Sequence, residues 1–262
     1  MKPILKIFCV IFVCLLMTGS AMADSNSYSW YCKRSVAHSQ PELGKELRFV
    51  DDYEVIWIDK SNKLFDDNEK KIYLTFDAGY ENGNIERILD VLKAEDVKAC
   101  FFILDNLIIK NEALIKRMIT EGHTVGNHTL RHRDMTKMAN IDEFANELEQ
   151  LENLYEKTFG IEMEKYYRPP EGKFNEQNLK WAKDLGYKTV MWSFAYADWD
   201  NDRQPSREYA TKKILDNLHN GEIMLLHPTS KTNADILQSI IREIKSKGFK
   251  FGTLSELCKD LK

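Results

Sequence analysis

The sequence predicts an α/β fold, a distorted or incomplete (β/α) barrel of about seven parallel strands in a single domain with a short N-terminal extension. Apolar runs of strand length alternate along the chain with segments of helical period, and this alternation is typical of parallel strands joined by helical crossovers. A doubly wound sheet is the alternative, but the glycine pattern G-x-G-x-x-G of nucleotide-binding sheets does not occur in the chain. The barrel is therefore the favoured architecture.

The chain begins with a segment typical of a secretory signal peptide, which we expect to comprise residues 1–23. Lys2 and Lys6 flank the start of an apolar run, Ile7–Met17, and a small-x-small cleavage pattern ends at Ala23. An uncleaved anchor is the alternative, but the run is shorter than the roughly 20 residues that a membrane span needs. We therefore expect export across the cytoplasmic membrane and no stable membrane span after cleavage.

The regular elements follow from the spacing of apolar residues. The expected strands are Ile72–Phe76, Ala99–Leu104, Thr124–Val125, Tyr166–Tyr167, Thr189–Phe194, Ile223–Leu226 and Phe249–Gly252. The expected helices lie near 84–95, 111–121, 141–159, 175–185, 207–219 and 233–247. The preceding segment, 24–71, is polar with scattered aromatic residues and is expected to be an N-terminal extension packed on a main domain, 72–262.

Charge and cysteine content narrow the class of protein. The chain carries 37 Lys and Arg against 41 Asp and Glu, a net charge of −4, which argues against binding to nucleic-acid phosphates. We expect a monomer without a nucleic-acid partner. Outside the signal segment Cys32, Cys100 and Cys258 remain, and an odd number cannot pair completely within the chain. Cys100 is expected to be a buried small hydrophobe, whereas for Cys32 and Cys258 a disulfide is one of the alternatives.

The stretch IYLTFDAGYENG, Ile72 to Gly83, runs from an apolar strand straight into a carboxylate, Asp77. Small and turn-forming residues follow it, which favours a loop. In a parallel barrel the groups that carry chemistry gather where the strands end. Asp77 is therefore expected on the face of the barrel where a reaction would take place.

A pair of histidines follows the third expected strand in GHTVGNHTLRHRDM. His128 and His132 are four residues apart, which on a helical turn places both imidazoles on one side, where they can bind one divalent ion. A solvated helix face is the alternative for this pair taken alone. His123 precedes the strand and is expected to be structural.

Three further strands end at polar side chains. Arg168 lies in YYRPPEG, Asp198 and Trp199 in YADWD, and His227 in MLLHP. Taken singly, each has an ordinary alternative: a surface arginine, a turn with solvated acids, or a structural histidine. Five strand ends that deliver polar groups to one face together indicate a metal-dependent hydrolase.

The same segments, TFDAG, HTLRH, RPPEG, ADW and LLH, resemble the five motifs of the polysaccharide deacetylase family, carbohydrate esterase family 4. The resemblance extends from Ile72 to Leu257. The longer stretches TFDAGYENG, WSFAYADW and LLHPTSKTNA are most similar to the subgroup that de-N-acetylates peptidoglycan N-acetylmuramic acid and leads to muramic δ-lactam in the spore cortex.

The resemblance implies hydrolysis of an N-acetyl amide on a peptidoglycan glycan strand, in the cell wall or spore envelope. Asp77 would be the general base that takes a proton from the attacking water, and Arg168 would hold Asp77 in place. His128 and His132 would bind a divalent metal, for which zinc is expected, and the metal would polarise the water and the acetyl oxygen.

The remaining roles also follow from the resemblance. His227 would be the general acid for the leaving amine, and Asp198 would orient it. The backbone N–H of Glu171 would stabilise the oxyanion. Trp199 and Leu225 would form the wall of the pocket for the acetate methyl group.

One position departs from the family pattern. Most members have a second acid directly after the base, as a third metal ligand, whereas this chain has Ala78. The subgroup also departs from the acid here, so Ala78 agrees with the subgroup and predicts a weak metal site. Glu81 and Asn82 lie nearby and could supply an oxygen.

Two other functions remain open at this stage. The first keeps the reaction but changes the sugar, to N-acetylglucosamine in peptidoglycan or in another polysaccharide. The second is a catalytically inactive, sugar-binding member, for which Ala78 is the main support. The other expected catalytic groups are present, and a binding protein needs no acid–base pair.

Overall fold

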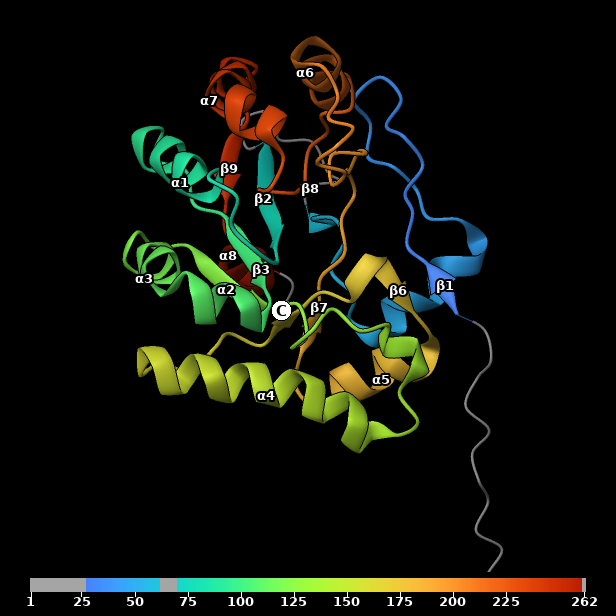
Figure 1. Cartoon of the computed structure of the whole chain (residues 1–262). Helices are drawn as coiled ribbons and strands as arrows, with labels where there is room; N and C mark the ends of the chain where they lie inside the picture. Colours follow the sequence, from blue (N-terminus) through green and yellow to red (C-terminus); the bar gives the residue numbers. More distant parts are fainter. Residues whose placement is uncertain (1–26, 62–69, 261–262) are drawn as a thin grey trace, which may run out of the picture.

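The computed structural model describes residues 27–61 and 70–260, and its centre is a curled, parallel sheet (Figure 1). The strand order is β7-β5-β4-β3-β2-β8, and β9 also pairs with β2. These strands are β2 (Lys71–Ala78), β3 (Cys100–Ile103), β4 (Thr124–Asn127), β5 (Tyr166–Tyr167), β7 (Lys188–Thr189), β8 (Glu222–Leu226) and β9 (Lys250–Gly252). The predicted single-domain, incomplete barrel is confirmed. The expected signal peptide lies outside the described residues.

Helices pack around the outside of this half-barrel (Figure 1). They are α1 (Ile85–Ala94), α2 (Asp105–Lys110), α3 (Glu112–Thr120), α4 (Ile141–Phe159), α5 (Glu176–Asp184), α6 (Arg207–Asp216), α7 (Lys231–Ser246) and α8 (Leu254–Asp260). The six expected helices correspond to α1 and α3–α7, whereas α2 and α8 were not predicted from the sequence. The longest, α4, begins where Asn140 accepts a hydrogen bond from the Glu143 amide and ends at Gly160, whose φ of 70° suits a glycine.

The central strand β2 explains why an apolar strand ends in an acid. Successive side chains of a strand point to opposite faces. Leu74, Phe76 and Ala78 belong to the large core beneath the helices, whereas Tyr73 packs in the smaller cluster inside the half-barrel. Asp77 lies on the same face as Tyr73, so its carboxylate is directed to the inner side at the carboxyl end of the sheet.

The N-terminal segment is built into the barrel. It contributes β1 (Tyr28–Ser29), which pairs with β6 (Lys173–Phe174), and the 3-10 helix η1 (Lys45–Tyr53). Its aromatic and aliphatic side chains form one cluster with three residues of the main domain. The members are Trp30, Leu43, Leu47, Val50, Val55, Trp57, Ile58, Phe174, Leu179 and Met191.

The same segment fills the gap between the edge strands β7 and β8. The Ile56 amide donates to the Thr189 carbonyl at 2.8 Å, and the Ile56 carbonyl accepts from the Met191 amide at 2.7 Å. Two residues further on, Ile58 forms an antiparallel bridge with Glu222 of β8. The extension therefore supplies the backbone hydrogen bonds that an open edge would lack.

The expected strand Thr189–Phe194 was too long. Regular pairing stops at Thr189 because the chain then changes partner, from the N-terminal segment at Met191 to β8 at Phe194. Each partner accounts for only one or two residues, so no continuous ladder forms. This irregular stretch leads directly to the loop that carries Asp198.

The three cysteines in the described residues are free. Cys32 donates to the Trp192 carbonyl at 3.1 Å, and Cys32 and Cys258 form no disulfide. Cys100 is buried, as expected. No helix in the described ranges is both long and apolar enough to cross a membrane.

Candidate active site

A buried arginine fixes the carboxylate at the end of β2. Arg168 follows β5 and its side chain is 0% exposed. Its Nη1 donates to Asp77 Oδ1 at 2.8 Å, and its Nε donates to the Val190 carbonyl at 3.0 Å. Its Nη2 donates to Thr75 Oγ1 at 3.0 Å and to the Met191 carbonyl at 3.2 Å. With every guanidinium nitrogen engaged, the ion pair has one fixed geometry.

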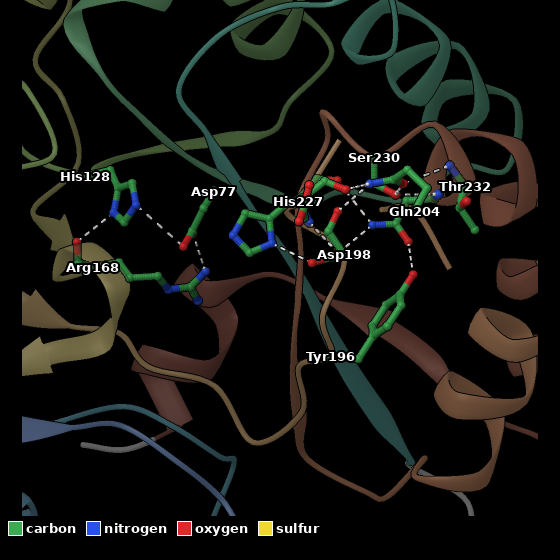
Figure 2. A network of polar contacts seen from close by, with 11 residues as sticks. Asp77, His128, Arg168, Tyr196, Asp198, Gln204, His227, Ser230 and Thr232 are labelled. Atoms are coloured by element: carbon green, nitrogen blue, oxygen red, sulfur yellow. Dashed lines mark hydrogen bonds and ion pairs between the residues drawn. The ribbon is translucent and has the colours of Figure 1, made fainter. Parts of the chain in front are cut away.

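This environment determines the charge of Asp77. Burial opposes ionisation, but the positive charge of Arg168, with smaller contributions from His128 and His227, lowers the pKa of Asp77 below its usual value. The carboxylate is therefore ionised at neutral pH and able to accept a proton. Figure 2 shows Asp77 between the imidazole rings of His128 and His227.

The first imidazole, His128, is held by the backbone. Its Nδ1 lies 2.8 Å from the Arg168 carbonyl, so Nδ1 carries the hydrogen and donates it. Nε2 then presents its lone pair toward the site, 3.6 Å from Asp77 Oδ2. Burial lowers the pKa of His128 to about 4, which leaves the ring neutral and suited to binding a metal.

The two histidines of the expected metal pair lie together, with ring centroids 5.0 Å apart. The physical reason given for this was wrong, because the segment is not helical. Thr129 and His132 have φ of 71° and 57°, in the left-handed region. The Thr129 hydroxyl accepts from the His132 amide at 2.9 Å, and Asn127 Oδ1 accepts from the Thr129 amide at 2.8 Å. A tight turn, rather than a helix face, pairs the rings.

The donor set fits a divalent ion that prefers nitrogen, but it is small. Ala78 packs in the large apolar core and offers no ligand. Glu81 accepts from the Ile85 amide at 2.9 Å, and Asn82 donates to the Thr229 carbonyl at 2.8 Å, so both are engaged elsewhere. Within 27–61 and 70–260 no three His, Cys, Asp or Glu side chains form a metal cluster. Two imidazoles, His128 and His132, remain as candidate protein ligands.

Asp77 and Arg168 form one dyad, and His227 and Asp198 form a second dyad at the carboxyl end of β8 (Figure 2). His227 Nδ1 donates to Asp198 Oδ1 at 2.7 Å, and the His227 amide donates to Asp198 Oδ2 at 2.9 Å. Burial disfavours the imidazolium, but the hydrogen bond and charge of Asp198, with a contribution from Asp77, raise the pKa of His227 above its usual value. His227 is thus biased toward its protonated form.

The other expected site residues occupy different environments. Trp199 is 60% exposed, and its ring centroid lies 6.1 Å from that of His227. Leu225 is buried on β8, on the same face as Ile223 of the inner cluster, and lies two residues before His227, which follows the end of the strand. Glu171 has φ of 55° in the 3-10 turn η5 (Pro170–Gly172), and its side chain pairs with Lys173 at the surface.

His123 is structural, as expected, since its Nδ1 accepts from the Ala99 amide at 3.2 Å. The residues that support these side chains were not predicted from the sequence. Thr75 Oγ1 accepts from Arg168 Nη2 at 3.0 Å, and Asn233 Nδ2 donates to Asp198 Oδ2 at 2.6 Å. Asn233 lies within the quoted stretch LLHPTSKTNA, but its partner is 35 positions away in sequence, so no local pattern identified it.

Comparisons with known proteins agree with this arrangement. Residues 66–190 match the family model described as polysaccharide deacetylase. The peptidoglycan-N-acetylmuramic acid deacetylase PdaA of Bacillus subtilis is 38% identical over 93% of this chain and 91% of its own. The solved structure of PdaA, described as a family 4 carbohydrate esterase, has a TM-score of 0.84 and covers 90% of this chain and 98% of that one.

Two other relatives show the range of the family. A peptidoglycan-N-acetylglucosamine deacetylase of Bacillus cereus is 34% identical over 77% of this chain and 74% of its own. The structure of BA3943 from Bacillus anthracis, described as a family 4 pseudoenzyme, is 29% identical, with a TM-score of 0.64, over 73% of this chain and 66% of that one. The fold, the paired dyads and these similarities lead to one conclusion: the chain belongs to the polysaccharide deacetylase family, carbohydrate esterase family 4, and is a hydrolase of N-acetyl amide bonds.

Proposed function

We propose that the protein removes the acetyl group from N-acetylmuramic acid of a peptidoglycan glycan strand, with the assistance of a divalent metal, and that the product leads to muramic δ-lactam in the spore cortex. One observation carries this proposal: the Asp77 carboxylate and the His227 imidazole are each held by a separate buried partner, Arg168 at 2.8 Å and Asp198 at 2.7 Å. These partners lower the pKa of Asp77 and raise the pKa of His227. Amide hydrolysis needs such a base and such an acid.

Asp77 is the proposed general base. Arg168 keeps it ionised and oriented, so the carboxylate is ready to take a proton from the attacking water. His227 is the proposed general acid, which delivers a proton to the leaving amine through Nε2. Its Nδ1 is engaged by Asp198, so Nε2 is the nitrogen that faces the substrate.

The remaining residues bind and position the acetyl group. Trp199 and Leu225 form the wall of a pocket for its methyl group, and the backbone N–H of Glu171 donates to the developing oxyanion. His128 and His132 would hold the metal, with zinc as the expected ion. When bound, the ion supplies Lewis-acid polarisation of the water and the acetyl oxygen.

Muramic acid is preferred as the sugar because PdaA, which matches nearly the whole chain, is described as a peptidoglycan-N-acetylmuramic acid deacetylase. N-acetylglucosamine is the second candidate, supported by the similarity to the Bacillus cereus deacetylase. We further propose a monomer exported by a signal peptide, residues 1–23, to the cell wall or spore envelope. Residues 24–71 would be the extension and 72–262 the catalytic domain.

Acetate release from peptidoglycan tests the proposal. Purified protein is incubated with glycan strands whose stem peptides have been removed, with and without added divalent ions, and the digested products are analysed by mass spectrometry. Loss of acetyl from muramic acid is expected. Loss from glucosamine alone would transfer the activity to the second candidate.

The matched control for this assay is Asp77→Asn, which keeps the shape of the side chain but removes the base. We expect its rate to fall by roughly 100-fold to 10,000-fold while its circular dichroism spectrum is unchanged. A wild-type protein that releases no acetate from any glycan but still binds the strands would support the inactive, sugar-binding alternative.

A further inference from the structure

The first turn of α7 places a buried amide against the His227–Asp198 dyad. Asn233 is 1% exposed. Its Nδ2 donates to Asp198 Oδ2 at 2.6 Å and to the His227 carbonyl at 3.1 Å, and its Oδ1 accepts from the Tyr196 hydroxyl. One side chain therefore contacts both members of the dyad.

The direction of this amide is dictated by its neighbours. An ionised carboxylate offers only acceptors, so Nδ2 rather than Oδ1 must face Asp198. Oδ1 then faces the Tyr196 hydroxyl, which must donate. Rotating the amide by half a turn would place its oxygen, an acceptor, against the Asp198 carboxylate, which also only accepts. The hydrogen bond from Tyr196 to Oδ1 works against that rotation.

The start of α7 is attached to the loop that carries Asp198 through Gln204 and Ser230 (Figure 2). Gln204 Nε2 donates to the carbonyls of Asp198 and Asp200 at 3.0 and 2.8 Å. Gln204 Oε1 accepts from the Ser230 hydroxyl at 2.5 Å, and Ser230 Oγ accepts from the backbone N–H of Asn233 at 3.1 Å. The helix start and the loop therefore form one hydrogen-bonded unit.

We propose that Asn233 is a positioning residue for the reaction: its amide locks the Asp198 carboxylate in the orientation that keeps the proton of neutral His227 on Nδ1, and Tyr196 sets the direction of the amide. This inference rests on the proposed function, because it takes His227 as the proton donor. Asp198 Oδ2 accepts from two donors, the His227 backbone N–H at 2.9 Å and Asn233 Nδ2 at 2.6 Å, so Asn233 is its one side-chain donor among the described residues. The charged groups that face His227 are Asp198, Asp77 and Arg168. The two carboxylates are acceptors only, and the Arg168 guanidinium is engaged by Asp77, Thr75 and two carbonyls.

A purely structural role is the competing explanation, in which the amide of Asn233 only fills space. The isosteric change Asn233→Asp separates the two. At acid pH a protonated carboxyl at this position still donates to Asp198, whereas at alkaline pH two carboxylates would oppose each other. A space-filling role predicts no such difference.

The first experiment measures kcat/KM for acetate release, as the ratio of Asn233→Asp to wild type, from acid to alkaline pH. We expect the ratio to fall roughly tenfold or more as the pH rises. The matched control is Asn217→Asp, since the side chain of the buried Asn217 donates to the Lys213 carbonyl, at 2.8 Å, and hydrogen-bonds neither Asp198 nor His227. Its ratio is expected to stay constant. Circular dichroism at each pH shows that the folded protein is being compared, and a constant ratio for Asn233→Asp overturns the proposal.

The second experiment does not use activity. Nitrogen chemical shifts of the His227 ring, assigned with His227→Gln, report which nitrogen carries the proton in the neutral form. We expect the proton on Nδ1 in the wild type and a mixture of both tautomers in Asn233→Ala and Tyr196→Phe. A wild-type tautomer in Asn233→Ala overturns this inference alone. Undiminished acetate release by His227→Ala would instead contradict the proposed function.

Discussion

Arg168 contacts both Asp77 and His128, the first through its side chain and the second through its backbone. Its guanidinium holds Asp77, while its carbonyl fixes the tautomer of His128. The left-handed turn that ends at His132 then brings the second ring alongside. The proposed base and the first expected metal ligand are thus positioned by one buried residue, and the second expected ligand by the adjoining turn, which explains how irregular backbone after three strands can form a defined site.

The pH dependence of deacetylation follows from the dyad. Burial works against the imidazolium of His227, but Asp198 and Asp77 outweigh it and raise the pKa. As the proposed general acid, His227 must be protonated, so kcat should fall as the pH rises through this raised pKa. Asp198→Asn removes a negative charge, which lowers the pKa of His227, and the alkaline fall in kcat should move to lower pH. A pH–rate profile checks this, and an unmoved alkaline limb would contradict it.

Metal affinity tests the small donor set. With His128 and His132 as the protein ligands and Ala78 in the apolar core, more coordination positions are left to water than at a catalytic zinc with three protein ligands. Titration calorimetry on chelator-stripped protein should therefore show weak zinc binding. His132→Ala, the control, should abolish it. Sub-nanomolar affinity in the wild type would show that the chain supplies a further ligand.

At the scale of elements, the sequence predicted the features that depend on neighbouring residues but not those that depend on contacts between distant segments. Apolar periodicity identified the strands of the large sheet, with the extent of Thr189–Phe194 wrong, and six helices, because each pattern lies within its own segment, whereas β1 and β6 were not predicted. The irregular stretch after Thr189 was taken for a strand because it is apolar, but its partners, Ile56 and Met224, are far away in sequence. The five motifs placed the site residues at strand ends for the same local reason, whereas Asn233 and Tyr196 depend on packing between elements.

The bridge made by Ile56 gives a testable energetic consequence. Its side chain is buried among residues of the inner cluster. Ile56→Ala leaves a cavity there, and the free energy of unfolding should fall by about 2–5 kcal/mol. Val36→Ala, in the same segment but at a position 75% exposed, should change it by less than about 0.5 kcal/mol. Urea unfolding measures both, and equal effects would mean that the segment is not part of the core.

At the scale of the molecule, the N-terminal extension is part of the folding unit. Trp30 and Trp57 share one apolar cluster with Phe174 and Met191 of the main domain. A chain that begins at residue 70 would expose this cluster to water. We expect the chain from residue 24 to unfold in a single cooperative transition and the shortened chain to unfold at a lower temperature or to remain unfolded. A shortened chain with unchanged thermal unfolding would show that the extension is dispensable.

The order of the sheet has a consequence for biosynthesis. The first strand of the large sheet, β2, has β8 as one neighbour and shares its other edge between β3 and β9, and Ile58 bridges to Glu222. None of the contacts with β8 can form before residues beyond 222 leave the ribosome. A growing chain therefore stays without its finished sheet until synthesis is nearly complete, a state that can still be threaded through a narrow secretion channel.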